Sequence, residues 1–379
     1  MTGSAAVTDT FESSDTAAWS TLVVRDLEAL DALAADWQRL AGSAAEPMQT
    51  HAWSAAAARA LHAGAKLCVI TVRRDSALVA VAPLVEGVRG GVRWLEVLGA
   101  AKLGEPVKFL SDNDQSLAAL CRALIAQRLP LSLQRLEGEA CLRAIGRLAR
   151  GRAVVMRVTG GSSLCVALDQ EREGYLRRLS AERAATLRRK RRQLEKSGAV
   201  RFEHVAPVPV DVVNELRAAF DVEARSWKGA AGSAVAARPE MFEFFRLLGE
   251  RYAADGRLLV RRLFAGTDVA AVHVAVVEAQ RCFELKIGYD ERFARSSPGM
   301  LLTCECLADS VDRGHRAHEF LGNAADWQRP LATSERMLTT LVVYPLSPRG
   351  VFALGIDVAG FAWRRLRQSF SRRNAAEAN

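Results

Sequence analysis

The chain has 379 residues, of which half are hydrophobic and a quarter are charged, and it carries a formal net charge of +9. This composition excludes a wholly disordered or fibrous protein, and at about 150 residues per domain the length predicts two or three domains. No run of about 18 uncharged apolar residues occurs, so we expect no membrane-spanning helix. The seven cysteines follow no framework spacing, which favours reduced thiols and a cytoplasmic location.

The first segment of the chain, residues 1–20, is rich in Ser, Thr and Ala and contains Glu12 and Asp15. It lacks the basic start and the apolar centre of a signal peptide. We therefore expect a flexible N-terminal tail.

Two stretches repeat one order of expected elements, which is helix, helix, hairpin, strand, helix, strand. In the first stretch these elements are residues 27–40, 53–64, 67–85, 91–99, 116–129 and 131–138. In the second they are residues 212–229, 239–256, 258–277, 281–290, 297–314 and 315–322. Trp37 and Trp227, 190 residues apart, occupy matching positions, so we expect both to pack in a core. The order predicts an α/β (α+β) fold in which helices flank a mixed, mostly antiparallel sheet in each copy.

The positive charge is confined to two segments. Residues 171–200 carry a net charge of +6 and residues 361–379 a net charge of +4, which leaves −1 for the remainder. The first segment predicts a helix over residues 175–197, and its five consecutive cations, Arg188 to Arg192, go most of the way round that helix. Either an anionic partner or carboxylates elsewhere in the fold would account for them.

The last segment, residues 346–379, predicts a C-terminal helix with a basic tail. Two arrangements fit this pattern, a helix docked on the body and an amphipathic helix on a membrane surface. We favour the docked helix.

The two copies differ in the residues at the start of one helix, which is expected over residues 297–314 in the second copy. Ser297 can cap the helix, Pro298 suits its first position, and Gly299 allows close approach of a ligand. The free amides of that turn, with Arg295 nearby, suit a phosphate or pyrophosphate, although such a sequence is also simply a good helix start. The matching helix of the first copy is entered through SDNDQSL, whose acidic residues would repel an anion.

Four short segments and their order along the chain indicate a family resemblance. They are LRRKRRQLEKSG, ARSWKG, YDERFARSSPGMLL and HEFLGNAADWQ. With the element order, they resemble the GNAT acyltransferase superfamily and most closely its tandem members of the CelD/BcsL type, associated with bacterial cellulose and exopolysaccharide production. Fem-type aminoacyl transferases share the doubled fold. The resemblance spans residues 20–345 and is strongest over 175–330. It implies two tandem GNAT-like domains, a non-catalytic one at 21–160 and an acyltransferase domain at 161–345.

The resemblance also implies site residues. The pyrophosphate of acetyl-CoA would lie on a loop made of Arg295, Ser296, Ser297, Pro298, Gly299 and Met300. The strand at 282–290 would follow the pantetheine arm, and strand alternation puts Glu284, Lys286 and Gly288 on one face. Further binding of the acceptor or of the cofactor's phosphates would come from Lys228, Arg188, Arg189 and Arg192.

Acyl transfer needs a base whose pKa is brought towards neutrality by burial. Glu284 fits this role by its strand position and His273 by residue type. A buried structural histidine and a solvent-facing glutamate would fit the same pattern. Relatives often carry Tyr-Lys after the glycine of the closing strand, whereas this chain has Trp327-Gln328 after Gly322.

Cys304 and Cys306, with His315 and His318, have the residue types of a zinc site. Helix positions two apart diverge by about 200°, so the two thiols cannot readily share one ion. We therefore expect no metal site.

These observations together predict an acyl-CoA-dependent N- or O-acyltransferase that uses acetyl-CoA and acts on a sugar or cell-envelope precursor. Two alternatives stay open. One is a Fem-like transferase that takes aminoacyl-tRNA as donor and binds RNA through its basic helix. The other is a non-catalytic accessory protein of polysaccharide synthesis. We expect a cytoplasmic protein, with association with a polysaccharide synthase or the inner membrane left open.

Overall fold

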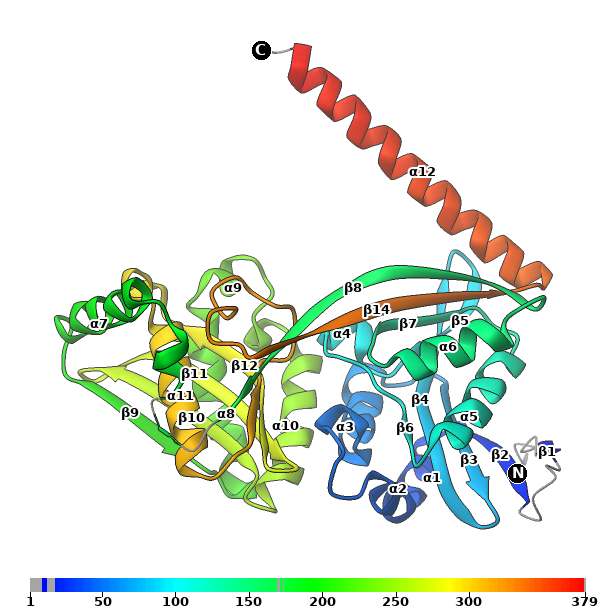
Figure 1. Cartoon of the computed structure of the whole chain (residues 1–379), viewed down its shortest axis with the longest axis horizontal. Coiled ribbons are helices and arrows are strands. Elements are labelled where there is room, and N and C mark those ends of the chain that lie inside the picture. The colour runs from blue at the N-terminus through cyan, green and yellow to red at the C-terminus, as the bar shows by residue number, and fades with distance from the viewer. Residues whose placement is uncertain (1–8, 12–17, 169–170, 173, 378–379) are drawn as a thin grey trace.

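The computed structural model describes residues 9–11, 18–168, 171–172 and 174–377. Two lobes lie side by side, and a pair of long strands bridges them (Figure 1). All described strands join one largely antiparallel sheet with helices on its faces, which confirms the predicted α/β (α+β) class.

The first lobe is built from the N-terminal part of the chain. Its strands are β1 Asp9–Phe11, β2 Trp19–Val24, β3 Leu67–Arg74, β4 Ala77–Arg89, β5 Val92–Val97, β6 Leu110–Ser111 and β7 Leu131–Leu136. Its helices are α1 Leu27–Ala32, α2 Ala34–Ala41, η1 Pro47–Gln49, α3 His51–Ala56, η2 Ala57–Leu61, α4 Ala100–Leu103, α5 Asp114–Ala126 and α6 Glu139–Leu148.

The second lobe repeats this order. Its strands are β9 Val200–Val205, β10 Leu258–Ala265, β11 Asp268–Glu278, β12 Arg281–Tyr289 and β13 Ala317–Glu319. Its helices are η3 Gly174–Arg178, α7 Ala181–Glu195, η4 Pro209–Asp211, α8 Val212–Ala224, α9 Trp227–Ala230, η5 Val235–Ala237, α10 Pro239–Ala253, η6 Glu291–Ser296 and α11 Pro298–Asp312. The bridging strands are β8 Ala153–Ala167 and β14 Ser334–Pro345, and α12 Pro348–Glu377 ends the chain.

The two bridging strands exchange between the lobes. The sheet runs β1-β2-β3-β4-β5-β7-β14-β8-β13-β12-β11-β10-β9, with β6 paired to β4. β14, which follows the second copy, pairs with β7 of the first lobe, and the end of β8, which follows the first copy, pairs with β13 of the second lobe. Each lobe is therefore completed by a strand from the other half of the chain.

This exchange corrects the predicted domain boundary between residues 160 and 161, which falls inside β8. Gly160 and Gly161, on either side of that boundary, serve the crossing of β8 and β14. A Cβ on Gly160 would lie 3.1 Å from the backbone of Leu338, and Gly161 has a φ of +86°. The first lobe therefore also includes most of β14, far beyond residue 160.

Helices and charges hold the lobes together. Trp53 of α3 meets Phe244 of α10 edge-to-face, with ring centroids 5.0 Å apart, inside one apolar core that draws on both lobes. Beside it, the Glu46 carboxylate lies 3.1 Å from Arg281 of β12 and 3.0 Å from Arg336 of β14. Apolar and ionic contacts together make the two lobes a single packed unit.

The two ends of the chain depart from expectation. β2 begins at Trp19 and β1 pairs with it, so part of the predicted N-terminal tail belongs to the sheet. The rest of that tail, residues 1–8 and 12–17, lies outside the described residues.

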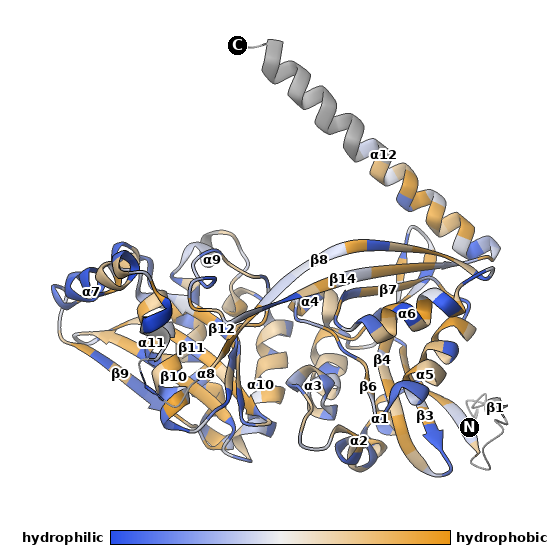
Figure 2. Cartoon of the chain, viewed as in Figure 1, coloured by the Kyte–Doolittle hydropathy of each residue, from blue (hydrophilic) through white to orange (hydrophobic). Residues whose placement is uncertain are grey.

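Helix α12 docks only through its first turns, where Ala353 packs against Trp94 and Tyr344 and the Tyr344 hydroxyl donates to Asp357 at 2.6 Å. It then extends away from both lobes (Figure 1), and its coloured part in Figure 2 is largely hydrophobic. The favoured docked helix is therefore observed at its first turns, whereas Phe361 and Trp363 farther along the helix are exposed. No helix in the described part of the chain is both long and apolar enough to span a membrane.

Candidate active site

The predicted cofactor loop lies where β12 turns through η6 into α11. Ser297 takes a left-handed conformation, with φ +49° and ψ +53°, and its side chain caps nothing, so the expected Ser297 cap is wrong. Amides in the first turn of a helix have no acceptor within the helix, and Gly299 and Met300 of this turn are partly exposed. Arg295 is exposed, whereas Ser296 and Pro298 are buried and shape the turn. The geometry leaves this first turn free to receive an anion.

The basic helix lies directly beside this turn. The structure shortens the predicted 175–197 helix, since η3 precedes α7 and Ser180 caps α7 by accepting from the Arg183 amide at 3.3 Å. Lys190 of α7 donates to the carbonyl oxygen of Arg295. The basic helix therefore packs on the second lobe, against the turn that leads into α11.

A cavity of about 360 Å³ opens between α7, the first turn of α11 and the segment at 326–331. Its apolar lining includes Leu187, Met300, Trp327 and Leu331, and its polar lining is Glu182, Arg183, Thr186 and Asp326. An uncapped helix start, a basic helix and an apolar cleft therefore converge at one place.

The arginines of α7 differ in their partners. Arg191 is neutralised by Glu305 at 2.8 Å and by Glu195 at 3.6 Å. Arg188, Arg189 and Arg192 are exposed, and the described part of the chain brings no carboxylate within ion-pair distance of them. Of the five cations of the run, carboxylates in the fold compensate Arg191, and Lys190 donates to the Arg295 carbonyl oxygen. An anionic partner fits the remaining three.

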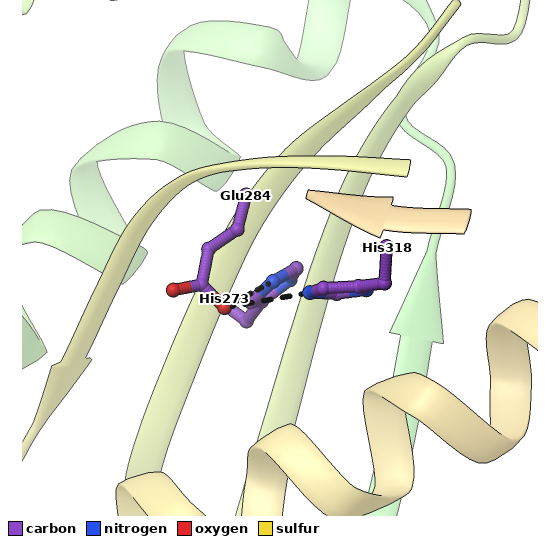
Figure 3. Close-up of side chains that lie close together, drawn as sticks. All are labelled: His273, Glu284 and His318. Atoms are coloured by element: carbon purple, nitrogen blue, oxygen red, sulfur yellow. Dashed lines mark ion pairs between the residues drawn. The ribbon is translucent and has the colours of Figure 1, made fainter. Parts of the chain in front are cut away.

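The two predicted catalytic side chains lie together in the interior (Figure 3). His273 of β11 places Nε2 3.1 Å from Oε2 of Glu284 on β12, and His318 of β13 places Nε2 3.6 Å from the same oxygen. His273 and His318 are 0% exposed and Glu284 is 4% exposed. The structure thus adds His318 to a pair that sequence reasoning proposed without it.

Opposing effects set the protonation of this cluster. Burial alone would raise the pKa of Glu284, but His273 and His318 outweigh it and lower that pKa to about 2. Burial lowers the pKa of His273 to about 4. Burial opposes the charge of His318 as well, yet Cys282 and Glu284 raise its pKa to about 9. Without a ligand, Glu284 is ionised and His318 carries the compensating positive charge.

Burial also separates these residues from the candidate cofactor site. Neither His273 nor Glu284 lines the cavity beside α11. Both side chains are buried beneath that helix. A bound acceptor has no direct path to either side chain in this structure. Their catalytic role stays a prediction.

A β-bulge in β12 overturns the predicted alternation. Ala275 of β11 pairs with Glu284 and Val274 pairs with Lys286, which leaves Leu285 as the extra residue. Beyond Leu285, each side chain of β12 lies on the face of the sheet opposite to the one that simple alternation predicts. Lys286 therefore lies over Phe245 of α10, 5.5 Å from the ring centre. A Cβ on Gly288 would likewise meet Glu223 of α8. Lys286 and Gly288 therefore do not share the face of Glu284, because one inserted residue reverses a period of two.

Sequence reasoning missed a buried ion pair next to the cluster. Arg261 of β10 is fully buried and contacts Asp309 of α11 at 2.6 Å, and His204 lies 3.0 Å from the same carboxylate. Burial would raise the pKa of Asp309, but the His204 hydrogen bond and the Arg261 charge hold it well below its usual range. The available signal was an arginine inside the apolar run LLVRRLF.

A second missed group joins the first lobe to the segment after β13. The Glu105 carboxylate accepts from the amide of Gly322 at 2.7 Å, and Arg135 donates to the carbonyl oxygens of Gly160 and Gly322. Burial raises the pKa of Glu105. The first lobe therefore positions the chain that follows β13, a function that no local motif could reveal.

The paired tryptophans do not play matching roles. Trp37 is 1% exposed, whereas Trp227 is 57% exposed. The prediction that Trp227 packs in a core is wrong, because α9 is a short surface helix. The side chain of Lys228, the next predicted binding residue, lies outside the described part of the structure.

Known proteins resemble the second lobe in sequence and the whole chain in fold. Residues 181–329 match the family model of the acetyltransferase (GNAT) domain. That range contains α7, the turn into α11 and the buried cluster. No curated protein matches the sequence significantly.

Solved structures share the whole doubled fold. FemX superimposes with a TM-score of 0.55 at 10% identity, covering 86% of this chain and 97% of that one. The C-terminal domain of a putative lysylphosphatidylglycerol synthetase from Agrobacterium fabrum gives 0.52 at 12% identity, covering 88% and 97%. A conserved protein of unknown function from Bacteroides thetaiotaomicron gives 0.52 at 7% identity, covering 85% and 99%. At such identities the likeness shows the fold alone.

Proposed function

We propose that the second lobe is an acyl-CoA-dependent N- or O-acyltransferase and that acetyl-CoA is its donor. The observation that carries this proposal is the uncapped first turn of α11, which opens on a cavity and lies beside a basic helix. The match of residues 181–329 to the acetyltransferase (GNAT) domain supports it independently.

The parts of the site correspond to the parts of the cofactor. The amides at Gly299 and Met300 would bind the diphosphate, because the positive end of the helix dipole favours anions there. The cations of α7 and Arg295 would add long-range attraction. Leu187, Met300, Trp327 and Leu331 would cover the pantetheine arm.

In the proposed reaction, an amine or hydroxyl of the acceptor attacks the thioester carbonyl carbon. The carbon–sulfur bond breaks with both electrons going to sulfur, and the acceptor loses its proton to a base. Trp327 stands near the place where relatives often carry Tyr-Lys, and an indole cannot protonate the thiolate, so that proton comes from water. The acceptor we propose is a sugar or cell-envelope precursor, in keeping with the CelD/BcsL resemblance.

Titration calorimetry with acetyl-CoA tests the donor. Wild-type protein should bind, and Gly299→Asp should weaken binding at least about tenfold, since a carboxylate at that position competes for the amides and repels phosphate. A Cβ on Gly299 meets Tyr289 and Ile287 at ordinary distances of 3.8 and 3.9 Å, so the variant should fold. Gln115→Asp, at the matching helix position of α5, is the control and should bind as wild type does. Absence of acetyl-CoA binding by the wild type would refute the proposal.

The exposed Arg188, Arg189 and Arg192 favour one second candidate, a Fem-like transferase with aminoacyl-tRNA as donor. Its binding of tRNA should weaken steeply with salt. Salt-sensitive tRNA binding without acetyl-CoA binding would support this candidate. Binding of neither ligand would favour a non-catalytic accessory protein.

A further inference from the structure

The His273, Glu284 and His318 side chains are buried with unsatisfied polar atoms. Both ring nitrogens of each histidine and Oε2 of Glu284 lack a hydrogen-bond partner of good geometry. The 3.1 Å contact between His273 and Glu284 is close but not aligned as a hydrogen bond. Native interiors rarely leave buried polar groups unpaired. Three such side chains that converge from three neighbouring strands (Figure 3) indicate a missing partner among them.

The spacing of the three donors fits a metal ion. One donor atom from each residue lies within 4.8 Å of the other two, and two of the separations are 3.1 and 3.6 Å. A tetrahedral zinc ion with bonds of about 2.0–2.1 Å holds its ligand atoms about 3.3–3.4 Å apart. The observed separations bracket that value, so an ion can enter with small side-chain movements.

We propose that His273, Glu284 and His318 bind a divalent transition-metal ion, with Zn²⁺ as the preferred ion. Two imidazoles and one carboxylate suit zinc and its neighbours, whereas Ca²⁺ and Mg²⁺ prefer oxygen ligands throughout. Both imidazoles must be neutral to bind the ion, so its binding displaces any proton that they hold. The nearby positive charge of Arg261 disfavours a cation at this place, and the Asp309 carboxylate 2.6 Å from Arg261 offsets part of that effect.

The site would act as a clamp on the sheet. β12 and β13 pair only through Arg281–Phe283 and Ala317–Glu319, and Glu284 is the first residue beyond that pairing. An ion held by β11, β12 and β13 would fasten the strands where they separate, directly under α11. This inference goes beyond the proposed function and gives His273 and Glu284 a structural role instead of a catalytic one.

The test uses the full chain after removal of metal with a chelator. Titration with Co²⁺ should give the visible d–d absorption of a low-coordinate site, saturating at one ion per chain. Zn²⁺ should displace the Co²⁺, bind more tightly than micromolar and raise the unfolding temperature. A wild-type chain that binds neither ion, measured without any acetyl-CoA, would overturn the inference and leave the proposed function untouched.

Variants identify the ligands. Glu284→Gln and His318→Gln should each lower Zn²⁺ affinity by more than about 100-fold, which exceeds the loss typical of groups that only orient a ligand. His315→Gln, three residues before His318, is the matched control and should still bind one ion. An equal loss in His315→Gln, or unchanged binding in Glu284→Gln, would contradict the assignment. Circular dichroism establishes that each variant is folded.

Discussion

The matching helices α5 of the first lobe and α11 of the second lobe have different N-termini. In the first lobe, Asn113 caps α5 by accepting from the Ser116 amide at 2.9 Å, and Asp114 occupies the first turn. In the second lobe, the first turn of α11 has no side-chain cap and no acidic residue, and Lys190 lies beside it. The same element order therefore produces one helix start that is already satisfied and one that is available to a ligand.

The strands beneath these two helices also differ in the polarity of their buried residues. Under α5, the strands β3, β4, β5 and β7 contribute Ile70, Ala82, Leu95 and Leu133 to an apolar core. Under α11, the corresponding strands β10, β11, β12 and β13 contribute Arg261, His273, Glu284 and His318. The two copies have thus kept one architecture, while in the described residues the strands under α11 carry buried polar groups where those under α5 carry apolar ones.

The largest expected difference concerns the matched tryptophans. Trp37→Ala should destabilise the protein by about 3–5 kcal/mol, because it empties a core site and removes a 2.8 Å hydrogen bond to the Gln49 carbonyl oxygen. Trp227→Ala should change stability by less than about 0.5 kcal/mol, as exposed substitutions usually do. Urea unfolding of both variants measures the contrast. Similar losses in the two variants would mean that α9 packs in solution.

The buried ion pair of the second lobe gives the next largest effect. Asp309→Asn leaves Arg261 buried without its charge partner and should destabilise the fold by about 3–5 kcal/mol at neutral pH. Asp312→Asn, on the same helix but half-exposed, is the control and should have little effect.

The same pair predicts a pH dependence. Because the pKa of Asp309 is lower in the folded state than its unfolded value of about 3.9, its contribution is present above that value and is lost as pH falls below it. Thermal unfolding between neutral and acidic pH should show wild type and Asp309→Asn converging at low pH. Parallel curves would contradict the ion-pair account.

The smallest effect is expected on the surface of α7. Reversing Arg188, Arg189 and Arg192 to Glu should weaken acetyl-CoA binding several-fold at low salt and less at high salt, because exposed charges are screened. Reversing Arg143, Arg147 and Arg150 in the first lobe provides the control. A loss of acetyl-CoA affinity that does not depend on salt would indicate that the substitutions had unfolded α7 and had not merely removed its positive charge.

The sequence predicted features that depend on neighbouring residues. The turn at Arg295–Met300, the basic helix and the repeated element order all follow from local patterns. Pairings across the chain could not be predicted, since nothing near His273 in the sequence points to His318 and nothing near Arg261 points to Asp309. The bulge at Leu285 was equally hidden, because an uninterrupted apolar–polar alternation looks the same with or without an unpaired residue. The predicted boundary at Gly160 and Gly161 falls inside β8, where a close strand crossing requires glycine.

Hydrogen exchange of the amides with and without acetyl-CoA tests the difference between the lobes most directly. We predict that acetyl-CoA slows exchange at the start of α11 and along the facing side of α7, and leaves the start of α5 unchanged. Protection at α5, or no protection at α11 under saturating acetyl-CoA, would contradict the assignment of the donor site to the second lobe.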